Sequence, residues 1–253
     1  MNGEKRSGGF GNGGELFPVR GGLRWLAAAS VASVCGVVVR SVYVGHPSFL
    51  FLFWNLLLAA FPLLFALLAA RNAEKGNRRG RVIAWGGLWL LFFPNAPYII
   101  TDFVHLGSWG ESPLWLDAVV IGSFAWTGLL LGFESLALLQ GIVRKKYGHG
   151  IGWGFVAAVL VVSSYGIYLG RFQRWNSWDL FTQPAALFAD IFSSIAHPSA
   201  TAQGLALTVG MGVFLLLSYC SVITLREKKM GGGAGIANPG KEMIQNTSTN
   251  TEH

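Results

Sequence analysis

The sequence has little charge and almost no cysteine. Only 12% of its 253 residues are charged, whereas soluble domains carry about 25%, and 52% of the residues are hydrophobic. Cys35 and Cys220 both fall within apolar runs and show no spacing typical of a metal site or a disulfide framework. The motifs of metalloproteases, serine hydrolases and P-loop proteins are also missing. These absences argue against an ordinary soluble domain, and no metal or cofactor is predicted.

Long apolar runs take the place of charge. Six of them approach the roughly 20 residues that a helix needs to cross a bilayer, and they are Leu23–Val44, Ser48–Ala70, Val82–Thr101, Leu114–Leu139, Ile151–Leu169 and Gln203–Leu225. The ten Trp and eighteen Phe fit, since aromatic residues gather at headgroup level. We therefore predict an all-α, polytopic transmembrane bundle of six spans. Its single domain covers residues 23–225, between disordered tails at 1–22 and 226–253.

The positions of the basic residues predict the orientation of the bundle. If both termini are cytoplasmic and the spans alternate, 16 of the 19 Lys and Arg residues lie on the cytoplasmic side. The sequence thus predicts a multi-pass protein of the bacterial cytoplasmic membrane, and its net charge of +7 reflects topology rather than nucleic-acid binding. Arg40, Arg171 and Arg174 are the three exceptions near the outer side.

The third span contains two prolines, in the stretch FFPNAPYIITDFVHL. Pro94 and Pro97 lack an N–H, so we expect the helix to break there, and the freed carbonyls to face protein or water. Asn95 is expected to cap the helix that resumes. Asp102 and His105, three residues apart, would then share one face near the outer surface.

A second polar cluster, GRFQRWNSWD, follows the fifth span. If residues Arg171–Asp179 are helical, the arginines and tryptophans form one stripe, and an arginine fork suits phosphate or carboxylate. An interfacial anchor is the alternative interpretation of this cluster. Asp117 lies shallowly in the fourth span, and residues Asp179–His197 read as a helix that lies on the outer surface or re-enters it.

These two clusters supply the candidate site. The proposed acid–base residues are Asp102, His105 and Asp179, and the proposed anion- or substrate-binding residues are Asn95, Asp117, Arg171, Arg174, Trp175 and Asn176.

The stretches PNAPYIITDFVHL, WLD and GIYLGRFQRWNSWD resemble an uncharacterised bacterial membrane family called domain of unknown function 1361. The resemblance runs from about Leu50 to Leu225 and implies a polytopic bacterial membrane protein, with no established activity. The family often has an aromatic residue before the Asp of the fourth span, where this chain has Leu116, and this difference weakens a special role for Asp117.

Three functions remain open on the sequence. The first is the binding or processing of an anionic amphiphile, such as a lipid-linked phosphate, at the outer side. The second is a structural or assembly role in which the polar motifs form internal ion pairs. The third is transport of a small solute or ion through a broken helix, which predicts a matching break in another span, with Pro62 as a weak candidate. Whether the chain is an enzyme stays undecided, as does its oligomeric state.

Overall fold

The computed structural model describes residues 19–75, 79–107, 112–196 and 202–232, and these residues form helices and no strands. Six helical segments of the described residues are long and apolar enough to cross a membrane, which confirms the predicted number of spans. The helices that contribute to them are α1 (Val19–Val44), α2 (Phe51–Glu74), α3 (Arg79–Phe92), α5 (Leu114–Tyr147), α6 (His149–Phe172) and α9 (Ala202–Gly232). The molecule is a multi-pass, all-α membrane protein.

The described residues fall into two compact units that divide within α9, between Gly212 and Val213. The first unit holds α1 to α8 and the start of α9, and the second continues α9 to Gly232. Both terminal helices extend beyond the predicted spans. Helix α1 begins at Val19, before Leu23, and α9 continues past Leu225 to Gly232. The remainder of the two predicted tails lies outside the described residues.

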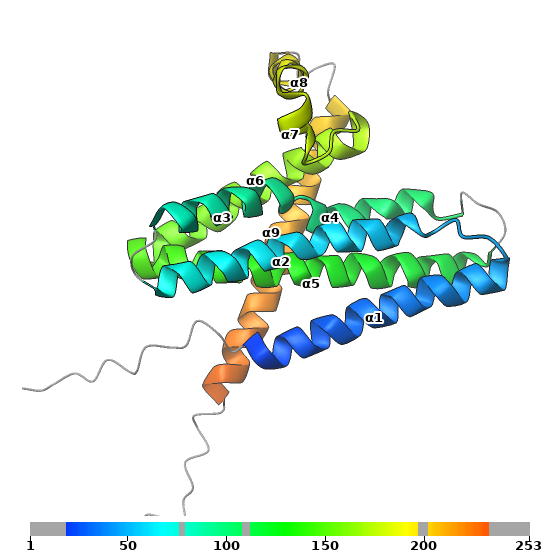
Figure 1. The fold of residues 1–253 in the computed structure, drawn as a ribbon, viewed down its shortest axis with the longest axis horizontal. Helices are drawn as coiled ribbons and strands as arrows, with labels where there is room; N and C mark the ends of the chain where they lie inside the picture. The colour runs from blue at the N-terminus through cyan, green and yellow to red at the C-terminus, as the bar shows by residue number, and fades with distance from the viewer. Residues whose placement is uncertain (1–18, 76–78, 108–111, 197–201, 233–253) are drawn as a thin grey trace, which may run out of the picture. The chain divides into compact units, whose positions relative to one another are not determined.

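Helix α5 is the centre of the first unit. It lies between α1 and α2 and also contacts α6 (Figure 1). Its 34 residues make a helix about 51 Å long, which exceeds the roughly 30 Å hydrocarbon core of a bilayer. Both Phe124 and Leu136 of this helix are fully buried. Because α5 touches most of the other spans, it is the element against which their polar residues are positioned.

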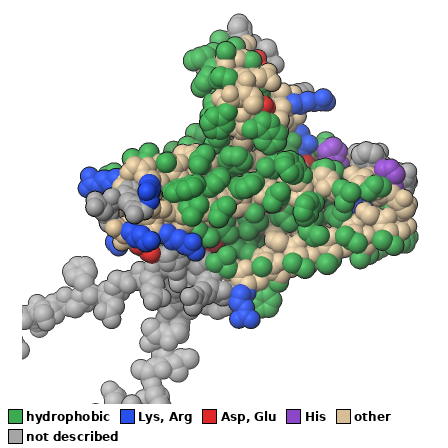
Figure 2. All heavy atoms as spheres, in the orientation of Figure 1, with side chains coloured by type: hydrophobic (Ala, Val, Ile, Leu, Met, Phe, Trp, Pro, Cys, Tyr) green, Lys and Arg blue, Asp and Glu red, His purple; other side chains and the backbone are tan. Residues whose placement is uncertain are grey.

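Exposed side chains follow the pattern of a membrane protein. Apolar side chains cover the face of the molecule in Figure 2, and basic side chains gather at one end of it. That end holds the C-termini of α2 and α5 and the start of α3, with the exposed residues Arg71, Lys75, Arg79, Arg81, Arg144, Lys145 and Lys146. The orientation predicted from the sequence places that end in the cytoplasm, and it stays a prediction.

The third span is made of three pieces. Helix α3 ends at Phe92, after 14 residues or about 21 Å, which is too short to cross alone. A four-residue helix, α4 (Asn95–Tyr98), and a 3₁₀ helix, η1 (Ile99–His105), follow. Together the pieces give a 27-residue span, and the α-helical ladder is interrupted at Pro94, as a residue without an N–H requires.

Two pairs of glycines receive this broken segment. On α5, a Cβ added to Gly128 would lie only 2.7 Å from the carbonyl oxygen of Ala96, and one added to Gly132 would lie 2.9 Å from the Ala96 Cβ. The two glycines are four residues apart, which is the spacing that lets transmembrane backbones approach closely. Ala96 therefore packs directly against the backbone of α5 at these two glycines.

The second glycine pair is on α6. A Cβ added to Gly166 would lie 3.0 Å from Pro94, and one added to Gly170 would lie 3.1 Å from the ring of Tyr98. These glycines are also four residues apart. The segment from Pro94 to Tyr98 is thus packed between two helices that have no side chains at the points of contact.

Residues after the fifth span form two short helices, α7 (Asp179–Thr182) and α8 (Pro184–Ala196). At 13 residues, α8 is about 20 Å long and too short to cross a bilayer. Its Leu187 is buried, whereas Phe188 and Phe192 are exposed. This two-sided character is typical of a helix at a membrane surface, and the choice between a surface helix and a re-entrant one stays a prediction.

The glycine packing gives a testable prediction for stability. Gly128→Ala should destabilise the protein by about 1–3 kcal/mol, because the new methyl group meets a backbone oxygen that cannot move alone. Gly154→Ala is the matched control: it makes the same change on α6, where an added Cβ meets nothing within 4 Å, and alanine is the better helix former. Thermal unfolding in detergent measures both variants. Equal midpoints would contradict the close approach.

Candidate functional site

Side chains satisfy carbonyl groups in the last turn of α3, where the helix is interrupted before Pro94. Asn95 donates from Nδ2 to the carbonyl of Phe92, at 2.9 Å, and to Ser177 Oγ, also at 2.9 Å. Ser177 in turn donates to the carbonyl of Leu91 at 3.0 Å. Asn95 thus caps the end of α3, and the expectation that it caps the following helix is wrong: no side chain caps the start of α4.

A buried ion pair joins the two polar motifs. Arg171, in the last turn of α6, donates from Nη2 to Asp102 Oδ1 at 2.6 Å. Its Nε donates to Thr101 Oγ1 at 2.9 Å. The other carboxylate oxygen, Asp102 Oδ2, accepts from Asn55 Nδ2 of α2 at 2.7 Å. With only 1% of Asp102 exposed, this cluster ties α2, η1 and α6 together.

Tyr98 completes the surroundings of the arginine. The guanidinium carbon of Arg171 lies 4.7 Å from the centroid of the Tyr98 ring, within the range of a cation–π contact. The arginine therefore has an anion, a hydroxyl group and an aromatic face as partners. Such a set of partners holds a charge in place within apolar surroundings.

Helix α6 ends at Phe172, so the stripe predicted for a helix over residues 171–179 does not form. The reason lies at Arg174, which has a φ of 63° and is the one non-glycine residue with positive φ in the described ranges. A left-handed residue cannot continue a right-handed helix. The amide of Trp175 turns back to the carbonyl of Leu169 at 3.2 Å, and the side chain of Arg174 is exposed.

The rest of the second motif is held by its own side chains. Asp179 Oδ2 accepts from the backbone N–H of Asn176 at 2.7 Å, and Oδ1 accepts from Thr182 Oγ1 at 3.1 Å. Trp175 donates from Nε1 to Asp190 of α8 at 2.9 Å. Asp179 therefore organises a turn, and Trp175 ties this loop to α8.

Asp117 belongs to a separate cluster with Arg40. The Nε of Arg40 lies 2.7 Å from Asp117 Oδ1, and neither side chain is more than 2% exposed. Arg40 also donates to Ser48 and Ser112, and its guanidinium carbon lies 3.7 Å from the ring centroid of Phe49. This pair joins α1 to the start of α5. It is the second basic exception of the sequence to have an acidic partner.

His105 takes part in neither ion pair. Its ring contacts Phe51 edge-on, with centroids 5.2 Å apart. It lies one 3₁₀ turn beyond Asp102, but the described residues show no hydrogen bond between the two. Its predicted role as an acid or base stays a prediction.

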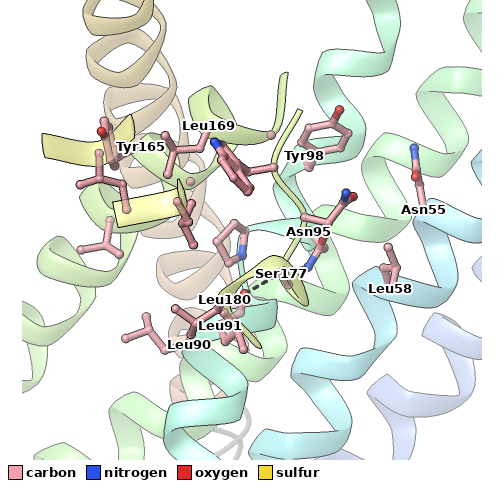
Figure 3. Close-up of a pocket in the computed structure, with 18 of the residues that line it drawn as sticks. Asn55, Leu58, Leu90, Leu91, Asn95, Tyr98, Tyr165, Leu169, Ser177 and Leu180 are labelled. Atoms are coloured by element: carbon pink, nitrogen blue, oxygen red, sulfur yellow. Dashed lines mark hydrogen bonds between the residues drawn. The ribbon is translucent and has the colours of Figure 1, made fainter. Parts of the chain in front are cut away.

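A cavity of about 500 Å³ lies beside the Arg171 cluster (Figure 3). Asn55 and Tyr98, which contact the ion pair from one side, line the cavity from the other. Apolar residues of α2, α3, α6 and α8 form most of its wall, among them Leu58, Leu90 and Leu169. In Figure 3, the hydrogen-bonded Asn95 and Ser177 lie between Tyr98 and the leucines at positions 90 and 91.

The comparisons place the chain in a family. A family model described as "Protein of unknown function (DUF1361)" matches residues 54–218, which is well over half of the chain. The chain belongs to this family. No curated protein and no solved structure matches it. The DUF1361 match covers α2 to α8, and so it includes both polar motifs and the cavity but not Arg40.

Sequence reasoning about this DUF1361 protein missed several partners. Asn55 is the one polar residue in a long apolar stretch of α2, and that isolation was a usable signal. Arg40 and Asp117 were noticed separately, and their common location at one end of two spans would have suggested the pairing. Ser177 carried no such signal, because an isolated serine in a loop has many roles.

The Arg171 pair predicts a non-additive mutant cycle. Arg171→Gln should destabilise this DUF1361 protein by about 3–5 kcal/mol, because it leaves the buried Asp102 carboxylate without its cation, and Asp102→Asn should destabilise it less, because the Arg171 side chain is 19% exposed. The double variant should lose clearly less than the sum. Unfolding in mixed detergent micelles measures the cycle, and Arg174→Gln, at an exposed position, serves as the control. Additive losses would contradict the pairing.

Proposed function

We propose that this protein binds a membrane amphiphile and holds part of its apolar chain in the cavity between α2, α3, α6 and α8. The observation that carries the proposal is the cavity itself. Its volume of about 500 Å³ lies within the roughly 300–1,000 Å³ of small-molecule sites, and it has the mostly apolar wall and few polar groups of such sites.

Access to the cavity supports a ligand that arrives from the bilayer. Trp54, Leu90 and Val162 line the cavity and are also exposed, and they lie within three different spans. In a membrane, surface of this kind faces lipid. An acyl or isoprenoid chain would reach the cavity without passing through water.

Binding is better supported than chemical processing. Both carboxylate oxygens of Asp102 accept hydrogen bonds from protein groups, and so do both oxygens of Asp179. A carboxylate that must remain bonded to hold a fold is poorly placed to shuttle protons. The catalytic roles predicted for these two residues therefore gain no support from the geometry.

An architectural role of the polar motifs is the second candidate, and a specific observation favours it. Arg171 and Arg40 each pair with a buried aspartate that lies more than 60 residues away in the chain. Each pair joins two spans. Transport gains no comparable support, because α2 continues without interruption through Pro62, where a matching break was expected.

Filling the cavity should weaken binding strongly. Val162→Trp places a large ring in the wall, and we expect at least tenfold weaker binding of oleoyl-chain amphiphiles. Val161→Trp is the matched control, because Val161 is the adjacent residue on the same helix and is similarly exposed but does not line the cavity. Equilibrium binding of tritiated probes to purified protein at fixed mole fraction in micelles measures both. Saturable binding that is the same in both variants would argue against the cavity.

A second prediction tests whether Arg174 holds an anion. Arg174→Gly should raise stability by about 1 kcal/mol, since glycine adopts positive φ without strain. It should leave probe binding unchanged, because Arg174 does not line the cavity. Thermal unfolding and the same binding assay give the two readouts. Loss of binding in a folded variant would assign Arg174 to the ligand's head group.

A further inference from the structure

The polar part of the cavity wall determines which head group the cavity would favour. In a bilayer, an apolar chain gains little by leaving lipid for an apolar cavity, because lipid tails are equally apolar. Selectivity must therefore come from the polar groups of the wall. Among the described residues, the polar groups that line the cavity belong to uncharged side chains, and no Lys, Arg, His, Asp or Glu lines it.

The three amide side chains of the wall have fixed orientations. Asn55 and Asn176 each donate from Nδ2 to a carboxylate, of Asp102 and Asp179 respectively, and Asn95 donates to a backbone carbonyl. Each partner can only accept, so the nitrogen and the oxygen of each amide cannot exchange places. The oxygen of each amide is left as an acceptor, without a hydrogen bond from the described residues.

Two further donors of the wall are engaged. The indole N–H of Trp175 donates to Asp190, and the hydroxyl of Ser177 donates to the carbonyl of Leu91. The hydroxyl groups of Tyr98 and Tyr165 and the indole of Trp54 also line the cavity, and the Tyr165 hydroxyl has no hydrogen-bond partner among the described residues.

The wall carries no charge. Arg171, which packs on the ring of Tyr98, is paired with Asp102 and is not part of the wall. The described residues of the cavity therefore offer both acceptors and donors, all of them uncharged.

From this uncharged wall, and building on the proposed function, we infer that the ligand presents an uncharged head group that donates and accepts hydrogen bonds, such as the hydroxyl groups of an alcohol or polyol. An anionic head would meet amide oxygens and no cation. A cationic amine would find acceptors but no carboxylate to neutralise it, and an unpaired charge in apolar surroundings is costly. A head group without donors would leave the amide oxygens unsatisfied.

Four oleyl- or oleoyl-chain probes separate these cases: monooleoylglycerol, oleoyl lysophosphatidic acid, oleylamine and methyl oleate. Each competes with tritiated monooleoylglycerol for the purified full-length chain, at matched mole fractions in micelles. We expect monooleoylglycerol to bind at least tenfold more tightly than each of the other three. Tightest binding by the phosphate or the amine, or equal binding by methyl oleate, would overturn the inference while the proposed function stands.

Two conservative variants connect this preference to the wall. Tyr98→Phe keeps the ring beneath Arg171 and removes the hydroxyl, and Asn176→Ala removes one amide oxygen and keeps the backbone bond to Asp179. Each variant should bind monooleoylglycerol about 3- to 10-fold more weakly, as expected for the loss of one neutral hydrogen bond, and should bind methyl oleate as the unmodified chain does. Tyr147→Phe, at an exposed position outside the cavity, is the control.

The outcomes distinguish a failure of the proposed function from a failure of the head-group assignment. If none of the four probes shows binding that Val162→Trp removes, the proposed function fails, and the inference fails with it. If binding depends on Val162 but both conservative variants bind monooleoylglycerol like the unmodified chain, the head-group assignment alone is overturned.

Discussion

The structure depends on backbone carbonyl groups that lose their intrahelical partners where α3 ends within a membrane span. A carbonyl without a partner in lipid costs several kcal/mol, so the break in the third span persists only where protein groups replace the lost bonds. Asn95 and Ser177 supply them, at Phe92 and Leu91. Because Ser177 follows the fifth span, these hydrogen bonds bring two segments that are more than 80 residues apart into contact, and the ion pair of Arg171 with Asp102 joins the same two motifs.

The broken segment also explains where the cavity lies. Glycine pairs on α5 and α6 let the segment approach closely at Ala96 and Pro94, so α4 is held at a fixed depth between two helices. Irregular backbone in a membrane is tolerated where it is buried in protein or lines a cavity. Both conditions apply here, because Ala96 is fully buried and Tyr98 lines the cavity.

The sequence was sufficient for the spans because hydropathy is a local signal, and each span is long enough to be recognised alone. The sequence also predicted, as one alternative, internal ion pairs between the polar motifs, and the pair of Asp102 with Arg171 is of this kind. The helix over residues 171–179 was wrong because one left-handed residue, Arg174, ended it, and arginine gives no sign of positive φ. The role of Ser177 could not be predicted, because no sequence pattern links this serine to the carbonyl of Leu91, to which it donates.

The pairing of Arg171 bears on the predicted binding of an anion by this motif. A phosphate that took the place of Asp102 on this arginine would leave the carboxylate buried without its cation. Breaking such a pair costs about 3–5 kcal/mol, whereas a hydrogen bond to a charged group contributes about 1.5–3 kcal/mol. The exchange is unfavourable unless the ligand also replaces the bonds that Asp102 loses. With its charge satisfied, the arginine fixes the wall formed by Tyr98 and Asn55, and in the proposed function the uncharged side chains of that wall recognise the ligand.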